Sequence, residues 1–324
     1  MSFSNPFVAL AGAVTVRDVA LRDGLQLVSQ PVATADKLEW VRSAYAAGLR
    51  HLEVGSFVPP RLMPQLADTA QVLAFAKTLP GLVTQVLVPN LRGAERALAE
   101  GADVMVLPLS ASHAHSLANL RQTPDDVLAE LGRIRAARDA VGAHTRLEVG
   151  ISTAFGCTLQ PSVDPGEVVR LVQGALDAGA DHVCLADTVG HANPMSVAQL
   201  LEAALKVAGA QLDAVHFHDT RGLGLANCLT ALQMGITRFD ACMGGLGGCP
   251  HAPGASGNVV TEDLAYLLES MGLDTGLDLD ALLALRAQIA ALLPGEALYG
   301  HFWKAGGGCT PTGLPSEQLT TSSP

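Results

Sequence analysis

Short apolar runs alternate with longer amphipathic stretches along nearly the whole chain. The runs consist mainly of valine, leucine and alanine, and each has the length of a buried strand rather than of a helix. They carry little of the strict apolar–polar alternation of a half-exposed strand, which favours a parallel sheet covered on both faces. We predict strands at Val14–Val19, His51–Gly55, Val83–Val88, Val104–Leu107, Arg146–Ile151, His182–Ala186, Ala214–Phe217 and Arg238–Ala241.

The stretches between these strands have apolar residues at helical spacing, most clearly in Thr34–Ala47, Pro124–Val141, Asp164–Ala178 and Met195–Ala208. Several helices end at a glycine just before the next strand, as at Gly48 and Gly179. This is the usual place of the left-handed residue that terminates a helix. Strand–helix units repeated without a polar linker predict an α/β fold, a closed (β/α)8 TIM barrel. A doubly wound open sheet is the alternative.

The end of the chain departs from the repeat. Leu277–Leu293 has the pattern of an added C-terminal helix, and residues 306–324 are rich in Gly, Thr, Ser and Pro. We therefore predict one (β/α)8 domain over residues 1–300, followed by a flexible, mobile tail over residues 301–324.

Composition narrows the class of protein. The net charge is −11, and no basic stripe stands out, which argues against nucleic acid as a partner. The six cysteines form no C-x-x-C pair, as is usual for reduced thiols in a reducing compartment. No apolar run has the length of a membrane span, and no cationic leader precedes the first apolar stretch. The expected location is cytoplasmic, without a membrane partner.

Polar residues at the ends of the predicted strands are the candidates for chemistry, because barrel enzymes work at the carboxyl ends of their strands. Asp23 follows the first strand, Glu53 lies in the second, and His216 and His218 end the seventh. Two histidines two residues apart on a strand point to the same face, and with one carboxylate they can hold a divalent ion. Histidines of the core or of the surface are the alternative.

Two further stretches are candidates. His113 and His115 follow the fourth strand in a Ser/Ala-rich stretch without a nearby carboxylate, so we predict a loop lining the site rather than a ligand pair. Glycines at 244–248 and 254–257 surround Cys249. A thiol with an ordinary pKa of about 8.5 can exchange a proton near neutrality. A plain flexible loop is the alternative.

Taken in order, these motifs resemble the hydroxymethylglutaryl-CoA lyase family, part of a wider group of metal-dependent barrel lyases and condensing enzymes. The residues that carry the resemblance are Arg22-Asp23-Gly24-Leu25-Gln26, Glu53 with Ser56-Phe57-Val58, Gly156-Cys157, Asp187-Thr188-Val189-Gly190, His216-Phe217-His218-Asp219-Thr220, Ala226-Asn227, and Gly245-Leu246-Gly247-Gly248-Cys249-Pro250 through Asn258. The match runs from about residue 14 to residue 275.

The resemblance implies an enzyme of leucine degradation that uses Mg²⁺ or Mn²⁺ to cleave 3-hydroxy-3-methylglutaryl-CoA into acetyl-CoA and acetoacetate. The metal ligands it implies are Asp23, His216, His218 and Asn258. The catalytic residues it implies are Arg22, Asp23, Cys249 and Glu53, with Arg22 at the thioester oxygen and Cys249 as an acid/base. The substrate contacts it implies are Arg22, Gln26, Ser56, Asn119 and Thr188. The partner is an acyl-CoA, and a homodimer or higher homo-oligomer is possible.

The chain departs from the family pattern at two charged positions. Leu27-Val28-Ser29 replaces a usual Asn-Glu-Lys, and Glu148 stands where an arginine is usual, four residues before Ser152. Ser29 removes a cation from the loop after the first strand, and Glu148 is expected to add negative charge beneath the site. Together they predict a preference for a related thioester of the citramalyl or methylmalyl type. The motifs also fit a condensing acyltransferase of the same fold, or a non-catalytic metal- or ligand-binding barrel.

Overall fold

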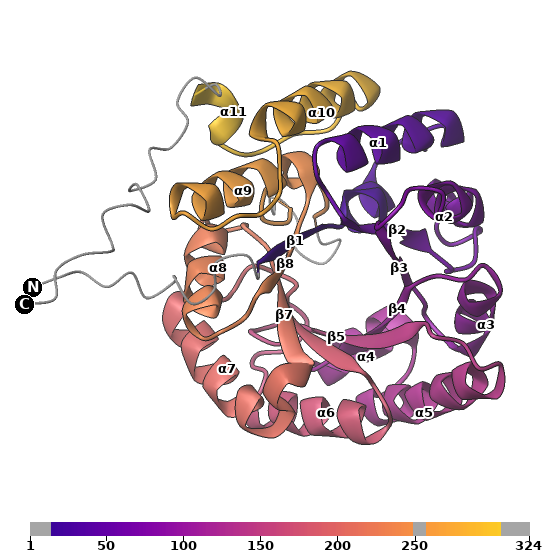
Figure 1. Cartoon of the computed structure of the whole chain (residues 1–324). Helices are drawn as coiled ribbons and strands as arrows, with labels where there is room; N and C mark the ends of the chain where they lie inside the picture. The colour runs from indigo at the N-terminus through magenta and orange to yellow at the C-terminus, as the bar shows by residue number, and fades with distance from the viewer. Residues whose placement is uncertain (1–13, 249–256, 306–324) are drawn as a thin grey trace, which may run out of the picture.

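The computed structural model describes residues 14–248 and 257–305. In these residues eight parallel strands pair in chain order and close into one barrel, so the predicted fold is confirmed and the open sheet is excluded (Figure 1). The strands are β1 (Thr15–Asp18), β2 (His51–Ser56), β3 (Val83–Leu87), β4 (Val104–Ser110), β5 (Arg146–Ser152), β6 (His182–Asp187), β7 (Leu212–Phe217) and β8 (Arg238–Ala241).

Helices surround the barrel on the outside (Figure 1). They are α1 (Thr34–Ala46), α2 (Thr69–Ala76), α3 (Leu91–Ala99), α4 (His113–Leu120), α5 (Pro124–Ala140), α6 (Pro165–Asp177), α7 (Pro194–Ala208), α8 (Gly224–Gln233), α9 (Thr261–Ser270), α10 (Leu279–Leu292) and α11 (Phe302–Ala305). Each of the clearest predicted helices is present. Gly48 and Gly179 have φ of +94° and +102°, as expected of residues that terminate α1 and α6. Within the described ranges, no helix is both long enough and apolar enough to cross a bilayer.

The segment after β4 differs from the prediction. β4 continues past Leu107 because its pairing with β5 extends to Ser110 and Ser152. The predicted loop with His113 and His115 is the first turn of α4, since the Ser112 side chain accepts a hydrogen bond from the His115 backbone N–H. Such a cap supplies a partner that the first turn of a helix lacks, so a short helix replaces the loop.

The added C-terminal helix is α10, which packs beside α1 and α9 (Figure 1). Residues 301–305, assigned to the tail by their sequence, instead belong to the folded part of the chain. The Phe302 ring stacks on Tyr266 with centroids 4.8 Å apart, and the Asp263 carboxylate accepts the backbone N–H groups of His301 and Phe302. These contacts fix α11 on α9. The remainder of the predicted tail, 306–324, lies outside the described residues.

The barrel interior beneath its mouth is polar. Side chains from β1, β5 and β8 meet there, since Arg17 contacts both Glu148 and Asp240, and all three are buried. His51 of β2 and Gln85 of β3 form a second buried pair, with Nε2 and Oε1 2.9 Å apart. The apolar core lies between the barrel and its helices, where Trp40 of α1 is fully buried. This arrangement leaves charged groups directly below the carboxyl ends of the strands.

Candidate active site

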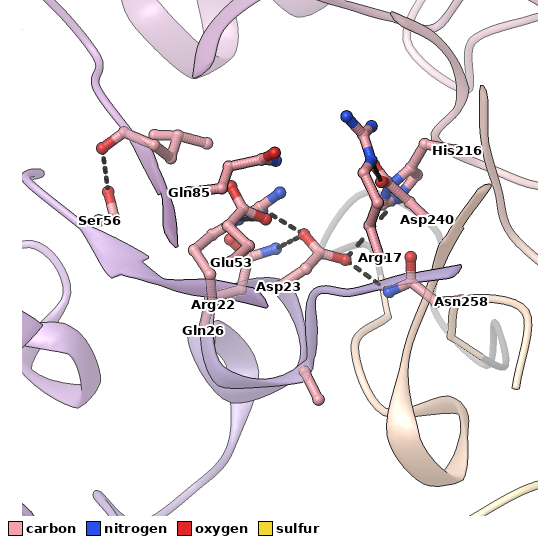
Figure 2. A network of polar contacts seen from close by, with 12 residues as sticks. Arg17, Arg22, Asp23, Gln26, Glu53, Ser56, Gln85, His216, Asp240 and Asn258 are labelled. Carbon is pink, nitrogen blue, oxygen red and sulfur yellow. Dashed lines mark hydrogen bonds and ion pairs between the residues drawn. The ribbon is translucent and has the colours of Figure 1, made fainter. Parts of the chain in front are cut away.

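The chain leaves β1 in a single turn of π-helix, Ala20–Gly24. The Val19 carbonyl accepts the backbone N–H groups of Arg22, Asp23 and Gly24, at 3.1, 2.7 and 3.4 Å. A wide turn of this kind is rare and is found mostly at functional sites. It places Arg22 and Asp23 at the mouth of the barrel, where their side chains lie beside one another (Figure 2).

Asp23, His216 and His218 converge at this mouth. One ligand atom from each lies within 4.8 Å of the others. The Asp23 Oδ2 atom is 4.0 Å from His216 Nε2 and 3.9 Å from His218 Nε2, and the two Nε2 atoms are 3.2 Å apart. Ligands of an octahedral ion with bonds of about 2.1 Å lie about 3 Å apart when they are adjacent and about 4.2 Å apart when they are opposite, so all three distances fall in this range. The three residues therefore have the spacing and the donor types of a divalent metal site.

Asn258 adds a fourth donor, and it lies in a bridge with His218. Its Nδ2 atom donates to Asp23 Oδ2 at 2.6 Å and to the Leu246 carbonyl at 3.2 Å. Its Oδ1 atom is buried without a hydrogen-bond partner in the described part of the chain. A buried amide oxygen without a partner is costly unless it binds something. Together with one carboxylate and two imidazoles it makes a mixed O/N set, which fits Mg²⁺ or Mn²⁺.

The protonation states of Asp23 and His218 also suit a metal. Burial raises the pKa of Asp23, but the Arg22, His216 and His218 side chains outweigh it and lower that pKa to about 2. Burial, with His216 nearby, lowers the pKa of His218 to about 4. Asp23 is thus a carboxylate and His218 a neutral imidazole at neutral pH, and these are the forms that coordinate metals.

Arg22 and Glu53 form the second part of the site. Arg22 Nε lies 2.7 Å from Glu53 Oε2 without the alignment of a hydrogen bond, so the contact is an ion pair. Both Glu53 oxygens are buried and lack a hydrogen-bond partner among the described residues. Burial raises the pKa of Glu53 to about 7, although Arg22 opposes the shift. Glu53 can therefore hold or accept a proton near neutral pH, beside a fixed positive charge.

The predicted substrate contacts are only partly brought together. Gln26 Nε2 donates to Asp23 Oδ1 at 2.9 Å, so it borders the metal ligands. Thr188 accepts the Thr153 backbone N–H at 2.8 Å, and Ser56 Oγ donates to the Leu87 carbonyl at 3.3 Å (Figure 2). Asn119 is exposed on α4. Within the described ranges, Ser56, Thr188 and Asn119 have no hydrogen bond to the metal-ligand set.

Cys249 lies outside the described residues, but the two ends of its loop are described. A side chain at Gly257 would clash with the backbone carbonyl oxygens of Gly245, Leu246 and Gly247. The two ends of the loop are therefore in contact, directly before Asn258, and glycine is the residue that allows this approach.

A further group of charged residues was not predicted from the sequence. Arg17 donates from Nε to Asp240 Oδ1 and from Nη1 to Glu148 Oε2, both at 2.6 Å. Asp240 Oδ2 is 3.1 Å from His216 Nδ1. Arg17 and Asp240 are the next-to-last residues of β1 and β8, whereas most candidates predicted from the sequence end or follow the strands, the usual place of catalytic residues in a barrel. The sequence did contain a signal for these two residues, because both are charged residues within otherwise apolar strands.

The structure corrects the expectation that the charge of Glu148 acts on the substrate. Its carboxylate is paired with Arg17, and the two side chains are only 6% and 1% exposed. The Glu148 carboxylate thus faces an interior cation of the same chain instead of a ligand. Ser29 is likewise engaged, since its N–H and Oγ both donate to Glu296 Oε1.

Two buried acids fix the start of the loop after β8. Asp18 Oδ2 accepts the Met243 N–H and the Thr261 hydroxyl, at 2.9 and 2.8 Å. Glu262 accepts the Gly244 N–H at 3.0 Å and pairs with Arg286 at 2.7 Å. These contacts tie the glycine-rich segment to α9 and α10, so the loop that leads to Asn258 starts from a rigid base.

Comparison with known proteins agrees with this geometry. The family model described as HMGL-like matches residues 13–289. The hydroxymethylglutaryl-CoA lyase YngG of Bacillus subtilis is 42% identical over 271 residues, 84% of this chain and 90% of that protein. The (R)-citramalyl-CoA lyase of Chloroflexus aurantiacus is 40% identical over 306 residues, 91% of this chain and 95% of that protein. An HMG-CoA lyase structure from Acinetobacter baumannii, in complex with coenzyme A and 3-methylmalate, matches with TM-score 0.85 and 38% identity, covering 94% and 97% of the two chains.

Proposed function

Because this chain belongs to the HMGL-like family, we propose that it is a metal-dependent carbon–carbon lyase that cleaves 3-hydroxy-3-methylglutaryl-CoA into acetyl-CoA and acetoacetate. The observation that carries the proposal is the convergence of Asp23, His216 and His218 within 4.8 Å of one another, with the unpartnered Asn258 oxygen beside them. Arg22 and Glu53 supply a cation and a proton-exchanging acid at the same mouth. The partner is an acyl-CoA.

Asp23, His216, His218 and Asn258 are the residues that would hold Mg²⁺ or Mn²⁺. A bound divalent ion lowers the free energy needed to ionise a substrate hydroxyl. The protein contributes the spacing of these donors and their charge state, with Asp23 ionised and His218 neutral.

The remaining residues act on the charge and the protons of the reaction. Cleavage of the carbon–carbon bond moves an electron pair onto the thioester, and the Arg22 guanidinium stabilises the resulting enolate oxygen. Glu53 holds Arg22 in place through the 2.7 Å ion pair. The enolate carbon then takes a proton, which we assign to the Cys249 thiol. We assign the proton lost by the hydroxyl to Glu53, and exchange with solvent returns a proton to the Cys249 thiol, so the protons balance.

The test is a cleavage assay with metal-free protein to which Mg²⁺ or Mn²⁺ is added back. Acetoacetate and acetyl-CoA should form in equal amounts only when the ion is present. Asp23→Asn should give neither product while its circular dichroism spectrum stays unchanged. Full activity in chelator, or no cleavage of any hydroxyacyl-CoA, would contradict the proposal.

A second candidate substrate is (R)-citramalyl-CoA. The observation that favours it is the relative from Chloroflexus aurantiacus, which bears that activity in its name and matches 91% of this chain. Measuring kcat/KM side by side for the two thioesters decides between them. A value of roughly 10⁴ M⁻¹s⁻¹ or more is ordinary for a metabolic substrate.

A further inference from the structure

The buried side chains of Arg17, Glu148 and Asp240 connect the barrel interior to one proposed metal ligand. Arg17 lies beside Asp240, and Asp240 lies beside His216 (Figure 2). The three strands involved are β1, β5 and β8, which are far apart in sequence. None of the three residues reaches the barrel mouth as a ligand, so their effect on the site must pass through His216.

Asp240 determines which nitrogen of His216 carries the proton. Its Oδ2 atom is 3.1 Å from Nδ1, and a carboxylate can only accept. Its other oxygen, Oδ1, accepts the Arg17 Nε–H at 2.6 Å, and this buried guanidinium favours the ionised carboxylate. In the neutral ring the proton is therefore on Nδ1. The Nε2 lone pair then faces Asp23 and His218, 4.0 and 3.2 Å away.

Arg17 in turn fixes Asp240. Its planar guanidinium donates along two directions, to Asp240 and to Glu148, and Nη2 approaches Cys184 Sγ at 3.8 Å. A lysine offers only a point charge and does not make such a fork. Glu148 holds the far side of the guanidinium. Two carboxylates against one cation leave a negative charge next to His216, which favours a cation at the mouth.

We propose that Arg17 and Asp240 are positioning residues for the metal centre: Glu148 holds Arg17, Arg17 holds Asp240, and Asp240 presents Nε2 of His216 to the ion. The inference rests on the proposed function only for the identity of what His216 binds. The tautomer of His216 is a property of the metal-free protein and does not depend on the reaction.

The first experiment measures that tautomer. ¹⁵N-histidine-labelled, metal-free protein is examined by NMR at about pH 9, where an ordinary imidazole is neutral. The wild type should carry the His216 proton on Nδ1. In Asp240→Asn the amide oxygen faces Arg17 and the amide NH₂ faces Nδ1, so the proton should move to Nε2. A proton on Nε2 in the wild type, or no change in Asp240→Asn, would overturn the proposal.

The second experiment measures Mn²⁺ affinity by calorimetry on the metal-free proteins. Changing the outer partner of a metal-ligating histidine typically weakens binding roughly 10- to 100-fold. We expect that loss in Asp240→Asn and in Arg17→Lys. Glu148→Gln should retain affinity, because its amide oxygen still accepts from Arg17, whereas Glu148→Ala should not. Full affinity in Arg17→Lys would show that charge alone matters and would overturn the positioning role.

A matched control variant, together with the unfolding temperature of each variant, tests whether a loss of affinity reflects a general loss of structure. Arg238→Lys changes another arginine of the barrel strands, which pairs with Asp213 at 3.1 Å outside this group, and it should bind Mn²⁺ normally. The two proposals fail separately. Absence of Mn²⁺ binding by wild type, with the tautomer as expected, refutes the metal site alone. Tight Mn²⁺ binding that is unchanged in Asp240→Asn refutes the positioning role alone.

Discussion

Asp23 is the residue on which most of the site depends. Its two oxygens contact Arg22, Gln26 and Asn258, and Oδ2 also lies 4.0 and 3.9 Å from the Nε2 atoms of His216 and His218. A carboxylate with so many donors around it keeps its charge when buried. Replacing it with a neutral group of the same shape therefore changes the electrostatics without changing the packing.

Asp23→Asn should weaken Mn²⁺ binding at least about 100-fold, more than is typical for the outer partner of a ligand. Turnover should fall with it, since the proposed reaction depends on the ion. Calorimetry with Mn²⁺ measures the first effect and acetoacetate formation the second. Normal Mn²⁺ binding would remove Asp23 from the ligand set.

Arg22→Met should lower kcat by on the order of 10²–10³-fold, the usual loss when a donor to developing negative charge is removed. The effect on KM should be small, because the charge that Arg22 stabilises arises mainly in the transition state. Steady-state kinetics with saturating metal separates the two parameters. A large rise in KM at constant kcat would instead make Arg22 a ground-state binding residue.

Cys249→Ser should likewise depress kcat far more than KM, since a hydroxyl is a much poorer proton donor than a thiol. Alkylation of the wild-type protein should inactivate it, and a CoA ester should protect it. Cys249→Ala with normal activity would leave the loop without a catalytic residue.

At the scale of elements, the sequence predicted the strands and helices that have a periodic pattern of apolar residues. It did not predict the elements that depend on a single turn. The eight strands could be predicted from apolar runs, because strands covered on both faces are mostly apolar. The π-turn at Ala20–Gly24 and the helix at His113–Leu120 have no periodic signal, since each is set by one backbone acceptor or one cap. The proposed ligand residues could be named from spacing and resemblance. Arg17 and Asp240 were not, because their role depends on contacts between distant strands.

Arg286→Met tests how firmly α10 and α9 fix the loop after β8. The Arg286–Glu262 pair is 7% and 1% exposed, and removal of one partner leaves a buried charge. Such a change typically costs about 3 kcal/mol of unfolding free energy. Arg170→Met, which breaks exposed pairs with Glu167 and Asp125, is the control and should cost about 0.5 kcal/mol or less. Urea unfolding of both variants measures the difference, and equal effects would contradict a fixing role for this pair.

At the scale of the whole molecule, the site brings together residues from the first strand and from the last two strands of the barrel. Asp23 follows β1, whereas His216 lies in β7 and His218 and Asn258 follow β7 and β8. The donors therefore meet only where the barrel closes between β1 and β8. An ion bound across that closure stabilises the native state over the unfolded chain, in which these residues are far apart. Metal binding should therefore be visible in the stability of the entire fold.

Mn²⁺ at a concentration 100-fold above its Kd should stabilise the fold by about 2.7 kcal/mol. In a chain of this size each kcal/mol moves the unfolding midpoint by about 2 °C, so the expected rise is about 5 °C. A chelator should reverse it, and Asp23→Asn should show neither the rise nor the reversal, because it lacks the charged donor at the closure. Thermal scans at a fixed scan rate with Mn²⁺, with chelator and with the variant make the comparison. A rise of the same size in Asp23→Asn would mean that the ion binds elsewhere on the chain. The stabilisation could then not be attributed to the proposed metal centre.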